Sequence, residues 1–274
     1  MNNIFVLFDF ETTGLDPFKN NRIVQIGAIL LRAKNKNNVS FDKIVHPKIP
    51  VSKYSVASKI HKISTNRLRN AKSFKYIFKE FADWLCSIKK NDENIILCGH
   101  NSFDFDNNFL VVEMLRYNLE EYIPFDIFLS DSLHIFRSWF PNEKSHSLPI
   151  LYKNILNKEL IGAHNALTDV NAMRKIMCKY NKIQTQHNQD YNIEKNMIEL
   201  CNLRNIKDEI IRIKQKIIQE NINLLPEIFY IRSDKYNKHI IKKDGGRWDD
   251  INRAYYYNSK QMYDNAVENV RIIF

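Results

Sequence analysis

A short acidic stretch directly after an apolar run constrains the fold of this chain more than any other feature. Residues 4–8 are the kind of apolar run that forms a strand buried on both faces, and Asp9 and Glu11 follow within the same segment. Side chains alternate along a strand, so these two acids project from one face. Neighbouring carboxylates repel each other and resist burial, which a bound cation would offset. Oxygen ligands suit hard divalent ions, so the stretch predicts a Mg²⁺ or Mn²⁺ site; the alternative is a solvated strand end followed by an ordinary glycine turn.

Length and charge narrow the class of protein. With 274 residues, the chain can form one large domain, or a medium domain with an accessory module. Its net charge of +10 favours a polyanionic partner such as nucleic acid, although heavy use of Ile, Asn and Lys also fits an A+T-rich genome. We find no apolar stretch of about 20 residues and no room for a signal peptide before the first strand. We therefore expect an intracellular protein, cytoplasmic or nuclear, with no membrane partner.

Residues 1–183 alternate strand and helix patterns. We expect strands over residues 4–8, 22–32, 39–45, 95–98 and 128–130, and helices over 72–89, 109–115, 134–140, 145–156 and 169–177. The first three strands would form an antiparallel meander, and the fourth would lie parallel after a crossover helix. The pattern predicts an α/β fold with a mixed sheet of roughly five strands flanked by helices.

Two further acidic motifs stand where the chain enters a helix. The fourth strand leads into residues 99–110, which contain Asp104 and Asp106. These acids follow the carboxyl end of the strand, and this is where α/β folds bind ligands. Helix capping is the alternative explanation for these acids. Later, Asp169 lies in the first turn of a helix, with His164 five residues earlier on the approaching loop.

Together the motifs FDFETTGLD, HNSFDFDNNFL and HNALTD resemble the DEDDh branch of the DnaQ-like 3′–5′ exonucleases, which have an RNase H-like fold. The resemblance covers roughly residues 1–183, and weaker similarities fall at residues 60–64, 131–133 and 145–148. It implies a 3′–5′ exonuclease that releases nucleoside monophosphates, in proofreading or repair. The spacing of the second motif is similar to that of the three-prime repair exonucleases; it selects Asp106 as the motif's acid, with Asp104 as the alternative.

The resemblance also implies roles for individual residues. Two divalent cations, Mg²⁺ or Mn²⁺, would catalyse phosphodiester hydrolysis, with His164 as the general base near neutral pH. The metal ligands would be Asp9, Glu11, Asp106 and Asp169, and the 3′ nucleotide would contact Thr12, Thr13, Gly14, Leu15, His100 and Asn101. We expect single-stranded nucleic acid with a free 3′ end as substrate, and DNA rather than RNA. The alternatives are an exoribonuclease and a non-catalytic nucleic-acid-binding protein on the same scaffold.

The composition changes after residue 183. Residues 184–192 are rich in Asn and Gln and predict a linker, and residues 193–224 carry apolar side chains every three or four positions, as an amphipathic helix does. This helix would form either a coiled-coil homodimer or a contact with the exonuclease domain, and the sequence leaves both open. We assign residues 184–225 to this linker and helix.

Residues 226–274 predict a small basic and aromatic α+β module. Its pattern is similar to that of a module found in some phage, bacterial and large-virus proteins. Cations interleaved with aromatic rings suit single-stranded nucleic acid, although a small core would need the same aromatic residues. The expected accessory contacts are Lys242, Lys243, Arg247, Trp248, Arg253 and Tyr255.

Overall fold

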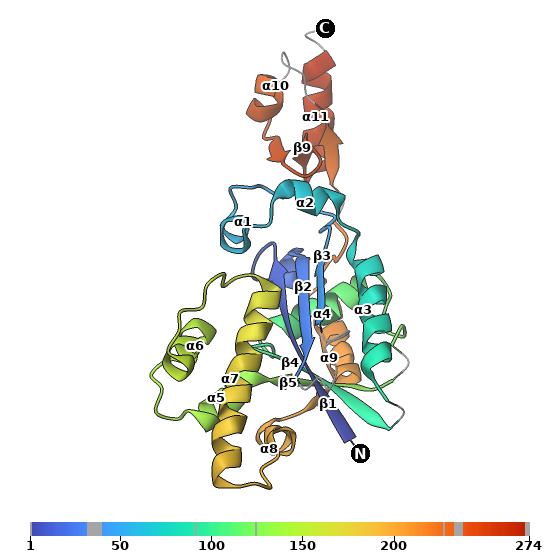
Figure 1. Ribbon diagram of the computed structural model, residues 1–274. Helices are drawn as coiled ribbons and strands as arrows, with labels where there is room; N and C mark the ends of the chain where they lie inside the picture. Colours follow the sequence, from blue (N-terminus) through green and yellow to red (C-terminus); the bar gives the residue numbers. More distant parts are fainter. Residues whose placement is uncertain are drawn as a thin grey trace.

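A mixed sheet forms the centre of the computed structural model, which describes residues 2–31, 40–90, 92–123, 125–226, 228–232 and 238–271. Within these residues the sheet has six strands, in the order β3-β2-β1-β4-β5-β6 (Figure 1). The strands are β1 (Asn2–Thr12), β2 (Ile23–Leu30), β3 (Ser40–Ile44), β4 (Glu93–Gly99), β5 (Ile127–Asp131) and β6 (Arg204–Asn205). Strand β1 pairs antiparallel with β2 and parallel with β4, and β2 pairs antiparallel with β3. The predicted antiparallel meander and the parallel fourth strand are confirmed. Residues 32 and 39, predicted as ends of the second and third strands, lie outside the described residues.

Helices cover both faces of this sheet (Figure 1). They are α1 (Val56–His61), α2 (Thr65–Asn70), α3 (Phe74–Ile88), α4 (Asp106–Arg116), α5 (Ser132–Trp139), α6 (Leu148–Leu156) and α7 (Ala166–His187), with a 3₁₀ turn η1 (Pro17–Lys19) after β1. Along β1, Val6, Phe8 and Phe10 join one core with α3 and α4, while Phe5 and Leu7 join a second core with α5, α6 and α7. Burial of each such side chain contributes about 1.5–3 kcal/mol, which explains why β1 is central.

The segment after α7 differs from the prediction. The expected single helix over 193–224 is wrong, because the chain forms two helices, α8 (Ile193–Leu200) and α9 (Ile206–Gln219). Between them β6 pairs with β5 and adds a strand beyond the five predicted. The apolar side chains of α8 pack in the core around α7, and those of α9 pack in the core around α4. The face assigned to a coiled coil is therefore buried within the chain, and α7 extends to His187, into the predicted linker.

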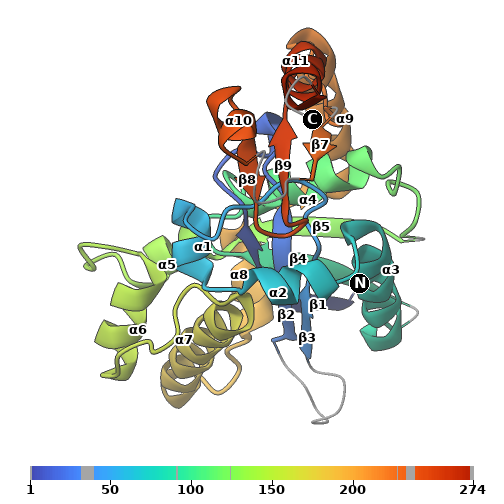
Figure 2. The ribbon, with the colours of Figure 1, turned by 90° about the horizontal axis from the view of Figure 1, so that it is seen from above.

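The C-terminal module projects from the end of the sheet where β1 ends and α7 begins (Figures 1 and 2). It consists of β7 (Phe229–Ile231), α10 (Lys238–Lys243), β8 (Arg247–Asp249), β9 (Ala254–Tyr257) and α11 (Lys260–Arg271), with the strand order β7-β9-β8. Tyr255 is only 2% exposed, and its ring lies edge-on to Trp248 at 5.1 Å. The prediction that Tyr255 contacts nucleic acid is therefore wrong, because this small sheet needs that ring in its core.

None of the helices in the described part of the chain combines the length and hydrophobicity that a membrane span requires.

Candidate active site

Three acids from distant parts of the chain meet at one end of the sheet. Asp9 and Glu11 lie on the same side of β1, and Asp169 lies in the first turn of α7. One carboxylate oxygen of each lies within 4.8 Å of the others. The sequence motifs thus meet in space as their order and spacing predicted.

Two residues of β2 allow α7 to approach the acids. Gly27 pairs with Asp9, and a Cβ atom added to Gly27 would lie only 2.5 Å from the carbonyl carbon of Ala166. Gln25 pairs with Glu11, and its side-chain oxygen accepts a hydrogen bond from the Ala166 N–H at 3.3 Å. Sequence reasoning missed both residues. The available signal was a glycine inside an apolar strand, which often marks a close backbone approach.

The structure favours Asp106 over Asp104 as the fourth acid. Asp106 is 2% exposed, and its Oδ1 accepts a hydrogen bond from the Phe10 N–H at 3.0 Å, between the two acids of β1. Asp104 is exposed on the preceding loop. That loop is shaped by buried Asp131, whose carboxylate accepts the N–H groups of Asn101 and Phe103, and whose role sequence reasoning missed. The signal for Asp131 was the weak similarity at residues 131–133.

Burial raises the pKa of every carboxylate in the cluster, and repulsion by neighbouring acids of the cluster adds to this effect at Asp9 and Glu11. Burial, followed by the charges of Asp106, Asp169 and Glu11, holds the pKa of Asp9 well above its ordinary value. Burial raises the pKa of Glu11 to about 8, and the charge of Asp169 adds to this effect. Burial likewise raises the pKa of Asp106 to about 7 and that of Asp169 to about 6, although a backbone N–H opposes it in each case. Within the described residues no Lys or Arg forms an ion pair with these acids, so the oxygen-rich cluster fits divalent cations.

His164 lies on the exposed loop before α7. Its φ of 65° is left-handed, a conformation that histidine adopts more readily than most residues. Its backbone N–H donates to Oδ2 of Asp169 at 2.9 Å, and its side-chain charge lowers the pKa of Asp169. The loop therefore holds the imidazole beside the acids, in contact with solvent.

The turn after β1 presents a hydrophobic tip. Thr12 donates its hydroxyl to the carbonyl of Gly14 at 2.6 Å, and the Thr13 hydroxyl accepts the N–H of Arg22. These bonds fix the turn, while Leu15 at its tip is 84% exposed. The turn therefore leaves an apolar side chain open to solvent just beyond the end of β1.

His100 and Asn101, the two residues after β4 that were predicted to contact the 3′ nucleotide, differ in their exposure and hydrogen bonding. Asn101 is exposed with a left-handed φ of 60°. His100 instead uses both ring nitrogens inside the protein, at 2.9 Å from the Ser132 hydroxyl and 2.9 Å from the His146 carbonyl oxygen. We therefore replace the predicted substrate contact of His100 with a structural role, joining β4 to α5.

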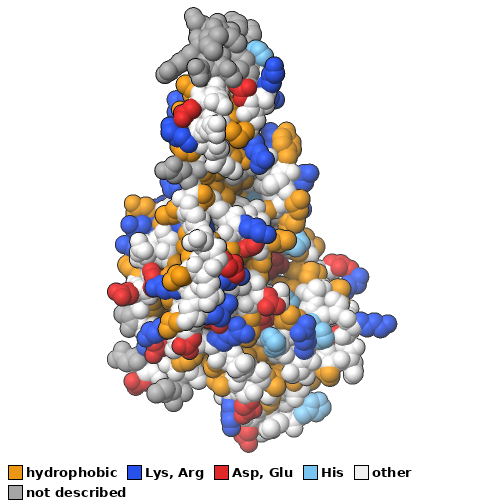
Figure 3. Space-filling view, turned by 180° about the vertical axis from the view of Figure 1, so that it is seen from behind, with side chains coloured by type: hydrophobic (Ala, Val, Ile, Leu, Met, Phe, Trp, Pro, Cys, Tyr) orange, Lys and Arg blue, Asp and Glu red, His pale blue; other side chains and the backbone are white. Residues whose placement is uncertain are grey.

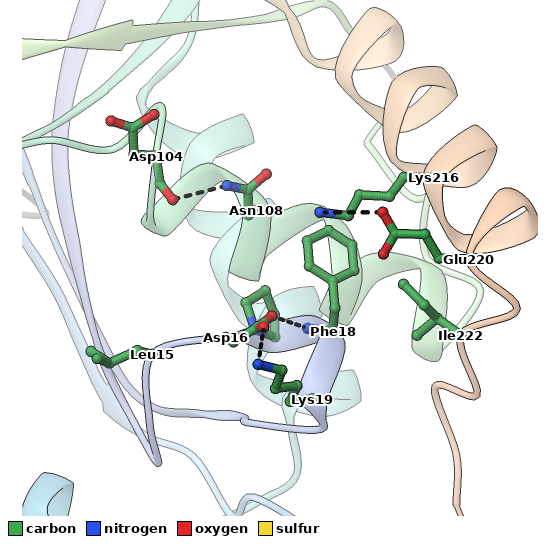
Figure 4. A pocket seen from close by; sticks show the side chains of 10 residues that line it. Leu15, Asp16, Phe18, Lys19, Asp104, Asn108, Lys216, Glu220 and Ile222 are labelled. Carbon is green, nitrogen blue, oxygen red and sulfur yellow. Dashed lines mark hydrogen bonds and ion pairs between the residues drawn. The ribbon is translucent and has the colours of Figure 1, made fainter.

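A pocket lies beside the turn, between η1, α4 and α9 (Figure 4). The ammonium of Lys216 lies 4.2 Å from the centre of the Phe18 ring and 4.0 Å from Glu220. The charged side chains of its wall are Asp16, Asp104 and Glu220 against Lys19 and Lys216. This balance of three acids against two lysines does not favour binding of a phosphate.

Comparisons with known proteins decide the family. The exonuclease family model RNase_T matches residues 6–177. The chain belongs to this exonuclease family. It is 32% identical over 233 residues to the DNA polymerase III subunit epsilon of Buchnera aphidicola subsp. Schizaphis graminum, covering 81% of this chain and 93% of that protein. The DEDDh, DnaQ-like 3′–5′ exonuclease predicted from the motifs is confirmed.

Solved structures show that the exonuclease fold is shared. The nuclease domain of 3′hExo, a DEDDh family member bound to rAMP, is similar with a TM-score of 0.54 and 20% identity, covering 66% of this chain and 92% of that one. E. coli exonuclease I in complex with single-stranded DNA is similar with a TM-score of 0.52 and 20% identity, covering 68% of this chain and 42% of that one. The RNase H-like fold is thereby confirmed.

Proposed function

We propose that this exonuclease removes nucleoside monophosphates from the 3′ end of single-stranded DNA by metal-dependent hydrolysis. The observation that supports the proposal most is the convergence of Asp9, Glu11 and Asp169 within 4.8 Å, with the pKa of each carboxyl raised. Asp106 completes the ligand set for two cations, Mg²⁺ or Mn²⁺. Such ions, when bound, stabilise charge on the attacking and leaving oxygens of the phosphodiester.

The protein's own groups would position the reactants. The rigid face of β1 and the first turn of α7 fix the carboxylates, so little reorganisation accompanies the reaction. His164 would accept a proton from the attacking water at a ring nitrogen, because its loop is open to solvent and lies against Asp169. Thr12, Thr13, Gly14, Leu15 and Asn101 surround the same edge and would hold the terminal nucleotide.

RNA is the second candidate substrate. One structural neighbour is a 3′-exonuclease described with a histone mRNA stem-loop, and 3′hExo was solved with rAMP. We favour DNA because the relative that aligns over most of this chain is a DNA polymerase subunit. Matched DNA and RNA oligonucleotides, compared by kcat/KM, will decide between them.

Free 3′ ends are required if this proposal is correct. With Mg²⁺ or Mn²⁺, we expect an oligonucleotide with a 5′ label to shorten one nucleotide at a time, and the same strand with a blocked 3′ end to stay intact. Gel electrophoresis of both strands measures this, with an Asp9→Ala variant as the control for contaminating nucleases. Internal cleavage, or equal shortening of blocked and free strands, would rule out the exonuclease mode.

Substituting His164 by alanine will lower kcat by about 10²–10⁴-fold, as expected for loss of a general base. The matched control is His187→Ala, an exposed histidine at the other end of α7. A His164→Ala enzyme with the parent's kcat would refute the assignment.

A further inference from the structure

The C-terminal module is joined to the exonuclease domain by buried contacts. The carboxylate of Asp249, which has no exposed surface, accepts the N–H of Val51 at 3.1 Å, and the Asp250 N–H donates to the Val51 carbonyl at 2.9 Å. Arg69 donates to the backbone carbonyls of Asp250 and Ile251 at 2.7 and 2.5 Å. Such a set of backbone and guanidinium bonds fixes the orientation of the module.

The same junction lies close to the catalytic strand. Ile251 is 1% exposed and packs in one cluster with Val24, Val51, Ile63 and Leu68. Val24 lies in β2 between Ile23 and Gln25, which pair with Thr12 and Glu11 of β1. The module is therefore anchored next to the strand that carries the acids, and it stands over that end of the sheet (Figures 1 and 2).

The described surface of the module carries several exposed cations. Asp249 and Asp250 are turned into the junction, and Asp264 pairs with Lys260. Lys242, Lys243, Arg247 and Arg253 are exposed and form no ion pair within the described residues. Blue side chains are distributed over the module and its base in Figure 3.

Trp248 adds a partly exposed aromatic side chain to the module. Its side chain is 41% exposed, and its indole N–H donates to Asp250 at 3.1 Å. The buried ring of Tyr255 contacts the indole edge-on at 5.1 Å. A partly exposed indole on a module with exposed cations provides the residue types that bind single strands, in which cations hold phosphates and rings stack on bases.

We propose that the C-terminal module is a second nucleic-acid contact, which holds the single strand that leads into the active site. Lys242, Lys243 and Arg247 contact its phosphates, and Trp248 stacks on a base. This inference rests on the proposed function, because it assigns to the module the same strand that the acids hydrolyse. It makes binding depend on strand length, since only a strand long enough to reach the module gains its contacts.

The test compares two double variants of the full chain that remove the same charge. Lys242→Ala with Lys243→Ala changes α10, while Lys179→Ala with Lys182→Ala changes exposed lysines on α7. Binding of a labelled single-stranded oligonucleotide is measured by fluorescence anisotropy in EDTA over a range of salt concentrations. Hydrolysis of a trinucleotide and of the long strand is measured separately with Mg²⁺ or Mn²⁺.

For the α10 variant we expect Kd for the long strand to rise about tenfold. The slope of log affinity against log salt should shrink by about 0.7 for each lost phosphate contact, or about 1.4 for two. The α7 variant should bind like the parent, and kcat/KM for the trinucleotide should be the same in all three proteins. A Trp248→Ala variant should weaken long-strand binding at least about fivefold with an unchanged salt slope.

Equal long-strand affinity in the α10 variant and the parent would overturn the inference. So would an equal loss in the α7 variant, or an equal loss of trinucleotide hydrolysis. Because binding is measured without metal, it is independent of catalysis. If the α10 variant binds weakly as expected while even the parent fails to shorten any strand, the proposed function fails and the second contact stands.

Discussion

Replacing Asp9 by asparagine will remove nearly all exonuclease activity and will also stabilise the metal-free protein. Asp9 lies among three other carboxyls, and burial together with their charges holds its pKa well above the ordinary value. Loss of a metal ligand should lower kcat by about 10³-fold or more, equivalent to about 4 kcal/mol of transition-state stabilisation. Replacing a carboxyl whose ionisation is opposed by burial and by neighbouring acids should raise the melting temperature in EDTA by several degrees, since about 1 kcal/mol shifts it by roughly 2–4 °C in a protein of this size.

The stability of the metal-free protein should depend on pH with a definite sign. A raised carboxyl pKa means that the folded state binds protons more tightly than the unfolded state, so stability falls as pH rises. The fall should begin near the ordinary values of about 4 and end near pH 8, because the folded pKa values are about 6 for Asp169, about 7 for Asp106 and about 8 for Glu11. Divalent cations should reverse this fall of stability with rising pH.

Thermal melts at pH 5 to 8, with EDTA and with Mg²⁺ or Mn²⁺, will measure this dependence. Asp9→Asn should flatten the pH dependence, whereas the surface control Asp83→Asn should leave it unchanged. If the metal-free protein becomes more stable between pH 6 and 8, or if divalent cations have no effect on the melt, the carboxyls do not form the site that we propose.

Replacing Glu113 by glutamine will destabilise the protein by about 3–5 kcal/mol, the usual result of removing one partner from a buried ion pair. Arg22, Glu113 and Arg116 are 3%, 1% and 4% exposed. The carboxylate of Glu113 lies 2.8 Å from Arg116 and 3.8 Å from Arg22. Without the Glu113 carboxylate, the guanidinium charges of Arg22 and Arg116 remain buried close together.

The same substitution should weaken substrate binding. Arg116 also donates to the carbonyls of Pro17 and Leu224, which ties the turn beyond Leu15 to the segment after α9. Urea unfolding will measure the loss of stability. Steady-state kinetics will measure the rise in KM. The control is Glu159→Gln, which breaks the exposed pair with Lys153 and should leave the unfolding midpoint unchanged. A Glu113→Gln protein as stable as the parent would show that this ion network contributes nothing.

The acids of β1 and the first turn of α7 could be predicted from the sequence because local patterns encode them. Alternation along β1 places Asp9 and Glu11 on one face whatever surrounds them. The five-residue spacing of His164 and Asp169 likewise places both at the start of one helix, and the observed N–H bond between them is a short-range contact. Such features need no knowledge of the rest of the chain.

Only the tertiary structure decided the features that depend on contacts between distant segments. Asp106 differs from Asp104 because it reaches the N–H of Phe10, 96 positions away. Gly27 matters because α7 packs against it. The helix expected over 193–224 divides because its apolar face is needed on both sides of the sheet, and Tyr255 is buried because a three-stranded sheet requires a core. Hydrophobic periodicity predicts that a side chain is buried. The segment against which it packs is determined by contacts between distant parts of the chain.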